Sequence, residues 1–165
     1  HFWLLNVYDR RPIPYAHEIV RSALKTQNLA GGYGVQWRSS ACEDIDSIDI
    51  LVRMGGELKE VEHQQIRFSL LRALSEILIS LNADGGWVFR PGENLCLPHP
   101  SMCSQKGESE LFFTWFRTLG LAYCLIGLGE YCPPELSFDW SLCRAPGLQM
   151  AVDWPFPATM SRNDV

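Results

Sequence analysis

Four carboxylates lie close together in the first half of the chain, and they are the residues best placed for acid–base chemistry. Glu43, Asp44, Asp46 and Asp49 fall within seven positions. At helical spacing Glu43, Asp46 and Asp49 follow one drifting face of a helix. Carboxyl groups held together in apolar surroundings have raised pKa values, so Glu43, Asp44 and Asp46 are candidates for a general acid. The alternative is structural, because Ser40 and Glu43 form a capping-box pattern and acids in a first turn favour the helix dipole.

A second cluster combines two thiols with an imidazole. Cys96, His99 and Cys103 lie within eight residues, and zinc prefers this set of ligands. The paired Cys-x-x-Cys spacing of short zinc sites is absent, so a loop that happens to contain these residues is the alternative, and we expect no obligatory cofactor. The chain has six cysteines, but its core-rich composition does not need disulfide bonds. We therefore predict reduced thiols and a cytoplasmic protein.

Aromatic residues form the third group. Together with one arginine they give six candidates for substrate binding: Tyr33, Trp37, Trp87, Trp115, Phe116 and Arg117. Aromatic rings could line an apolar pocket and stabilise a cationic reaction intermediate, whereas ordinary core packing is the alternative. Arg117 could bind an anionic ligand group or form an ion pair between helices, with Glu110 or Glu43 as its partner.

Four predicted helices position these residues. Apolar side chains recur at helical spacing over residues 15–27, 41–54, 61–81 and 110–127. Residues 87–89 are the only candidate strand. The connection over residues 90–107 is rich in Pro, Gly and Ser and has no periodic pattern, and a loop of this length is often functional. The sequence therefore predicts an all-α fold.

A Gly-Gly-aromatic turn occurs twice, at residues 31–33 and 85–87, with a constant offset of 54. In both copies a helix ends before the glycines and the next helix opens with acidic residues. A unit of this kind cannot bury its apolar face alone, so stacking of units is expected. We divide the chain into a first repeat at about 14–56, a second at about 61–130 and an irregular proline-rich tail at 131–165, all within a single helical-repeat domain or fragment over residues 1–165.

These residues resemble the repeat shared by terpenoid (squalene-type) cyclases and protein prenyltransferase beta subunits. The resemblance is carried by residues 24–33 (LKTQNLAGGY), by residues 81–87 (LNADGGW), which are similar to the core of the QW motif, and by residues 40–46 (SACEDID). It covers about residues 15–128. It implies an α/α toroid, in which helix pairs surround a central apolar cavity that binds isoprenoid chains. Two repeats are too few to close a ring, so the resemblance also implies further repeats in a longer chain or another subunit.

The expected function follows from this resemblance. It is a terpenoid cyclase-like or prenyltransferase-like domain that acts on, or binds, an apolar isoprenoid-type substrate. A non-catalytic helical-repeat binding module is one alternative. A carbohydrate-active α/α toroid is another, and it would need Glu43 or Asp46 about 5–10 Å from Glu108 or Glu110 across a cleft.

Charge and hydropathy exclude two other classes. The net charge is -5 and the basic residues are scattered, which argues against a general nucleic-acid binder. No uninterrupted apolar stretch reaches the ~18 residues of a membrane span. The sequence therefore predicts no nucleic acid and no transmembrane segment, and the resemblance implies a small apolar molecule as the partner.

Overall fold

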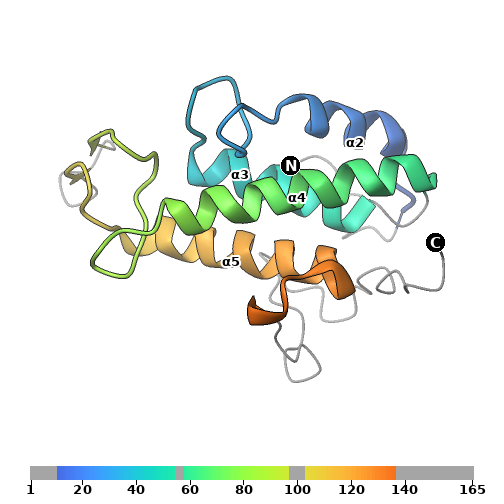
Figure 1. Cartoon of the computed structure of the whole chain (residues 1–165). Helices are drawn as coiled ribbons and strands as arrows, with labels where there is room; N and C mark the ends of the chain where they lie inside the picture. The colour runs from blue at the N-terminus through green and yellow to red at the C-terminus, as the bar shows by residue number, and fades with distance from the viewer. Residues whose placement is uncertain (1–10, 55–57, 97–102, 137–165) are drawn as a thin grey trace.

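Four α-helices carry the part of the chain that the structure, a computed structural model, describes: residues 11–54, 58–96 and 103–136 (Figure 1). The helices are α2 (Ala16–Lys25), α3 (Ala41–Met54), α4 (Glu60–Ile79) and α5 (Leu111–Leu128). Two short strands, β1 (Leu95–Cys96) and β2 (Cys103–Ser104), precede α5, and the 3-10 turns η3 (Gly129–Tyr131) and η4 (Pro134–Leu136) follow it. The all-α prediction is confirmed, whereas the predicted tail lies outside the described residues from position 137 on.

The most extensive helix contact is between α3 and α5, followed by α4 with α5 and α2 with α3. Figure 1 shows α2 and α5 on opposite sides of α4, with α3 behind it. The core between them contains Ile48 of α3 and Leu70 and Ile77 of α4, all at most 1% exposed. A glycine allows the close approach of α5, because a Cβ at Gly127 would lie 2.7 Å from Leu70 Cδ1.

Helices α3 and α5 each begin at a capped N-terminus. The Ser40 backbone N–H donates to Glu43 Oε2 at 2.8 Å, and the Glu43 N–H donates to Ser40 Oγ at 3.2 Å, so the predicted capping box is present at α3. At α5 the Glu110 carboxylate accepts hydrogen bonds from the backbone N–H groups of Phe112 and Phe113. These caps explain why α3 starts where the sequence pattern placed it.

The two glycine turns share one backbone hydrogen-bond pattern. The N–H of Asn28 donates to the carbonyl of Gly32 at 2.8 Å, and the N–H of Asn82 donates to that of Gly86 at 2.9 Å. The aromatic residue that follows donates its N–H to a side chain in the first turn of the next helix. This acceptor is Asp44 Oδ1 for Tyr33, at 2.8 Å, and Thr114 Oγ1 for Trp87, at 3.0 Å. The turns are therefore locally equivalent.

The connection after the second turn is longer. The turns are offset by 54 positions, whereas Asp44 and Thr114 are 70 apart, so the second connection contains 16 more residues. This insertion holds β1 and β2, which pair antiparallel with Leu95 opposite Ser104. The predicted strand at 87–89 is wrong, because its carbonyls bind helix starts instead of a strand: that of Trp87 accepts from the N–H of Glu110, and that of Phe89 from the N–H of Ala41.

One helix of the described part of the chain, with the 3-10 turn after it, is long and apolar enough by length and composition to cross a membrane. This segment is Leu111–Tyr131, with a mean hydropathy of 1.5. Two glycines, Gly120 and Gly127, lie inside α5 and do not interrupt it. The helix packs against α3 and α4 and buries Arg117, so this one candidate gives no clear transmembrane segment.

The first turn has no space for a side chain, which gives a test. A Cβ at Gly32 would overlap Ser39 Oγ and lie 2.8 Å from Asp44 Oδ1, whereas a Cβ at Gly85 would meet nothing within 4 Å. Gly32→Ala is expected to lower the free energy of unfolding by about 3 kcal/mol, measured by urea denaturation. The control Gly85→Ala, which strains only a backbone at φ +87°, should cost about 1–2 kcal/mol. Equal losses would contradict this account of the turn.

Candidate functional site

A buried ion pair lies at the centre of the acidic cluster. The guanidinium of Arg117 on α5 is paired through Nη1 with Asp44 Oδ2 on α3, and the two residues are 1% and 2% exposed. Nη2 of Arg117 donates to the carbonyl of Ser39 at 3.0 Å. Asp44 also accepts from Ser39 Oγ at 2.7 Å and from the N–H of Tyr33. The carboxylate thus joins the first glycine turn, the start of α3 and the middle of the molecule's most apolar helix.

Arg117 keeps its positive charge in this setting. Burial lowers the pKa of Arg117 to about 10, so the guanidinium is protonated at neutral pH. Its Nε atom has no hydrogen-bond acceptor among the described residues. Removing water from both charges costs free energy, and the pair is held because either partner alone would be a buried, uncompensated charge. Arg117 therefore forms the inter-helix ion pair that we predicted, but its partner is Asp44 and neither Glu110 nor Glu43.

The other acids of α3 are Glu43 and Asp49, which have arginine partners, and Asp46, which is half-buried. Glu43 forms the capping box and lies 3.2 Å from Nη2 of Arg90. Asp49 lies 2.5 Å from Nε of Arg53, and burial nevertheless raises the pKa of the Asp49 carboxyl. Asp46 is half-buried, and burial raises its pKa too. Glu43, Asp44 and Asp49 are thus held in caps and ion pairs.

Asp46 occupies the face of α3 that also carries Cys42, one turn earlier, and Asp49. Burial is the main cause of the raised pKa of the Cys42 thiol, and the charge of Asp46 raises that pKa further. The charge of Asp46 also raises the pKa of the Asp49 carboxyl. These side chains are therefore near enough to affect one another. A half-buried carboxyl with a raised pKa holds a proton at higher pH than an ordinary aspartate, which is the property required of a general acid.

The two acids proposed as partners across a carbohydrate cleft have local roles. Glu108 Oε2 accepts from the backbone N–H of Gln105 at 3.0 Å, and Glu110 caps α5. Both act within the connection between β2 and α5. Together with the capping role of Glu43, this gives each of these carboxylates an ordinary structural function.

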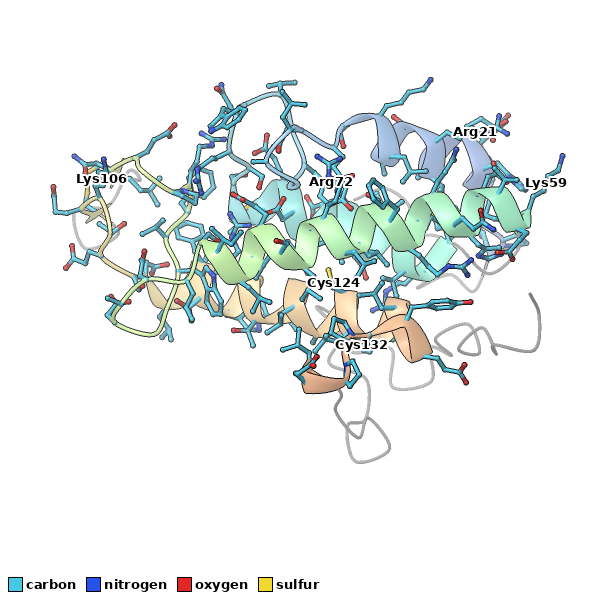
Figure 2. All side chains as sticks on the ribbon, in the orientation of Figure 1. Arg21, Lys59, Arg72, Lys106, Cys124 and Cys132 are labelled. Atoms are coloured by element: carbon cyan, nitrogen blue, oxygen red, sulfur yellow. A yellow bond between two sulfur atoms is a disulfide. The ribbon has the colours of Figure 1, made fainter. Side chains whose placement is uncertain are left out.

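The aromatic residues of the glycine turns are part of the core. Tyr33 is 0% exposed, and its hydroxyl lies 2.8 Å from Ser69 Oγ on α4. Trp87 is 8% exposed and donates its indole N–H to the carbonyl of Ile77 at 2.8 Å. Figure 2 shows Arg72 between α4 and the first turn, where its guanidinium donates to the carbonyl of Asn28 at 2.8 Å. Both rings therefore pack as core residues, as in the structural alternative.

The remaining predicted binding aromatics are partly exposed. Trp37 is 66% exposed in the loop before α3. Trp115 is 44% exposed on α5 and lies beside Phe116, with ring centroids 5.1 Å apart. Phe112 lies against both, at 5.9 Å and 4.5 Å respectively. The structure thus brings Trp115 and Phe116 together, whereas Trp37 lies in an exposed loop and Tyr33 and Trp87 are buried in the core.

Apolar residues remain uncovered along one side of α4 and α5. We call this surface the open edge, and it comprises Leu71, Ser75, Leu78, Trp115, Thr118 and Ala122. Leu71 and Leu78 are each 38% exposed, and Ser75 and Thr118 are exposed. Arg117 is the only charged residue within α5, and its side chain is buried on the opposite side. Contiguous exposed apolar surface of this kind typically marks a site of interaction.

The cysteine predictions require a correction. Cys96 and Cys103 form a disulfide across the β1–β2 hairpin, so neither thiolate is available to zinc and the prediction of reduced thiols is wrong for this pair. His99 lies outside the described residues, and no group of three or more potential metal ligands occurs within them. Figure 2 places Cys124 between α4 and α5 and Cys132 below α5, both as free thiols. Disulfides are more typical of oxidising compartments, so cytoplasmic localisation stays a prediction without support from the cysteines.

Sequence reasoning predicted an inter-helix ion pair for Arg117 but did not identify Asp44 as its partner. The signal for a pair was the lone arginine in an otherwise uncharged apolar helix, which must have a buried partner. Comparison with protein-family models, with curated proteins and with solved structures found no match. The resemblance to terpenoid cyclases therefore stays a hypothesis that depends on the motifs alone.

Removing either half of the buried pair tests its structural role. Asp44→Asn and Arg117→Met are each expected to lower the free energy of unfolding by about 3–5 kcal/mol, because each leaves a buried charge without its partner. The double variant should cost clearly less than the sum of the two, measured as a double-mutant cycle in urea. Glu93→Ala, which removes an exposed partner of Arg90, is the control and should change stability by about 0.5 kcal/mol or less. Additive losses would argue against direct pairing.

Proposed function

We propose that this chain is a non-catalytic helical-repeat binding module and that the open edge is its binding surface. The observation that carries the proposal is the absence of charge on an exposed, apolar side of two adjacent helices among the described residues. The engagement of Glu43, Asp44 and Asp49 in caps and ion pairs supports it, because a module of this kind needs its acids for structure only.

The equivalence of the two glycine turns supports the same proposal. In the first unit three residues of α3 face α5. Asp44 pairs with Arg117, Ile48 lies beside the position of a Cβ at Gly120, and Val52 lies beside the position of a Cβ at Gly127. Seventy positions later, in α5, stand Thr114, Thr118 and Ala122. The positions through which α3 contacts α5 thus correspond, in the second unit, to positions on the open side of α5.

The first helix of each unit shows the same relation. His17 and Arg21 of α2 face α4, where Glu62 lies 3.6 Å and 3.1 Å from them. Fifty-four positions later, in α4, stand Leu71 and Ser75, which are both exposed. The first unit contacts the second through certain positions of α2 and α3. The equivalent positions of α4 and α5 in the second unit are therefore uncovered. An incomplete toroid-like array would leave such an edge, and we propose that architecture for the chain.

Binding of an uncharged apolar probe tests the proposal. Nile red should bind to the open edge when the protein is dilute. Trp115→Gln should weaken this binding at least about fivefold, because it removes an exposed aromatic surface. Trp37→Gln removes a more exposed indole outside the open edge and serves as the control. Equal effects of the two variants, measured by fluorescence titration, would contradict the proposal.

A terpenoid cyclase-like activity is the second candidate, and one observation favours it. Asp46 is a half-buried carboxyl on α3, beside Cys42 and Asp49, and its pKa is raised by burial. A cyclase of this type would use such an acid to protonate an alkene or epoxide of an isoprenoid chain. Trp115 and Phe116 would then stabilise the cation through their ring faces.

Asp46→Asn separates this candidate from the binding module. Because burial raises the folded-state pKa of Asp46 above its unfolded value, its ionised form is disfavoured in the fold and stability falls as pH rises towards the folded pKa. The variant should therefore raise the melting temperature at pH 7 and not at a pH below both values. If the chain is a cyclase, the unaltered protein turns over an isoprenoid substrate and the variant does not. If it is a binding module, the variant shows the change in stability, but the unaltered chain has no turnover.

A further inference from the structure

We infer that the open edge binds a second copy of this chain, with the two copies of α5 packed antiparallel across a twofold axis at the level of Gly120. The inference rests on the proposed function, because it uses the same surface, and it names the partner. It is carried by the charge pattern of the edge, by the sizes of its side chains and by the arrangement of α4 and α5.

Charge indicates what kind of partner fits. In the first unit the contact positions are His17, which lies 3.6 Å from Glu62, and Arg21 and Asp44, which form ion pairs with the second unit. Their equivalents in the second unit are Leu71, Ser75 and Thr114, none of which is charged. A partner for this edge therefore needs no complementary charge. The edge itself meets that requirement, because two copies of it bring no like charges into direct contact.

Side-chain size indicates the orientation. Along its open side α5 carries Trp115, Thr118, Ala122 and Leu125, of which the last is partly buried. In an antiparallel pair centred at position 120, Trp115 lies opposite Leu125 of the second copy, and Thr118 lies opposite Ala122. Small residues at the centre allow two helices to approach closely, and the large residues then pack at both ends.

The two-helix edge favours the same axis. Gly120 lies beside Ile77 and Gly127 beside Leu70, so α4 runs antiparallel to α5. A twofold axis that reverses the helix direction places α5 against α5 and α4 against α4, so that Leu78 joins the interface from both copies. A twofold axis parallel to the helices would instead place α4 against α5. An interface in which each patch meets its own copy is the commonest arrangement in soluble oligomers.

A lipid surface is a poorer partner for this edge. The chain has a net charge of -5, with 19 acidic and 14 basic residues. Peripheral attachment to anionic lipid requires clustered Lys and Arg beside the apolar face, and the basic residues here are scattered. Two acidic copies also repel each other at long range, so added salt should strengthen their association by screening that repulsion.

The inference is tested by the mass of the unaltered chain in light scattering as a function of concentration. The mass should rise from that of a monomer to that of a dimer as the protein concentration increases. This transition should occur at a lower protein concentration in about 0.5 M salt than in about 0.05 M salt, where screening is weaker. Thr118→Lys and Ala122→Glu should each weaken association at least about thirtyfold, because each places an unpaired charge in the interface. An equimolar mixture of the two variants should recover most of the affinity, since the antiparallel pairing places the introduced lysine of one copy opposite the introduced glutamate of the other.

Val35→Lys, at a residue 96% exposed in the loop after the first turn, is the control and should associate like the unaltered chain. Circular dichroism should show the same helix content in all variants, because Thr118 is exposed and Ala122 partly so. A monomer at every concentration, a dimer indifferent to both edge variants, or a monomer that binds phosphatidylcholine vesicles would overturn the inference. If Nile red binding still depends on Trp115 in those cases, the binding module stands without this partner; if it does not, both proposals fail.

Discussion

The buried ion pair between Arg117 and Asp44 is the interaction on which the rest of the structure depends. It connects the most apolar helix to the start of α3, and through the N–H of Tyr33 it also fixes the first glycine turn. Neither charge has access to water, so the two helices cannot separate or slide by a turn without exposing an uncompensated charge in the core. The pair thus selects one register between α3 and α5 from the many that apolar packing alone would permit.

The second unit solves the same problem without charge. Thr114 stands where Asp44 stands in the first unit, and its hydroxyl accepts the N–H of Trp87. A neutral acceptor needs no counter-ion from a following helix, so the start of α5 is satisfied whether or not another helix covers it. The start of α3, which carries an aspartate, therefore requires a cationic partner from a covering helix, whereas the start of α5, which carries a threonine, does not.

Local features of the fold were predictable, and those that depend on tertiary contacts were not. Helical periodicity and the capping box placed α3 correctly because both are encoded within a few residues of the helix start. The strand expected at 87–89 did not form, because helix N-termini distant in sequence use its backbone carbonyls. The partner of Arg117 could not be chosen from spacing either, since Asp44, Glu43 and Glu110 all lie near a helix start and only the packing of α5 selects among them.

The same distinction applies to the acid of the second candidate function. Sequence spacing places Asp46 on a face with Asp49, but the burial that raises its pKa depends on tertiary packing. A carbocation survives only where water is excluded, and one exposed side of the aromatic residues Trp115 and Phe112 admits water. A cyclase that used these rings to stabilise a cation would therefore require them to be covered first. Binding is in this sense the more basic property of the surface, because catalysis would depend on it and it does not depend on catalysis.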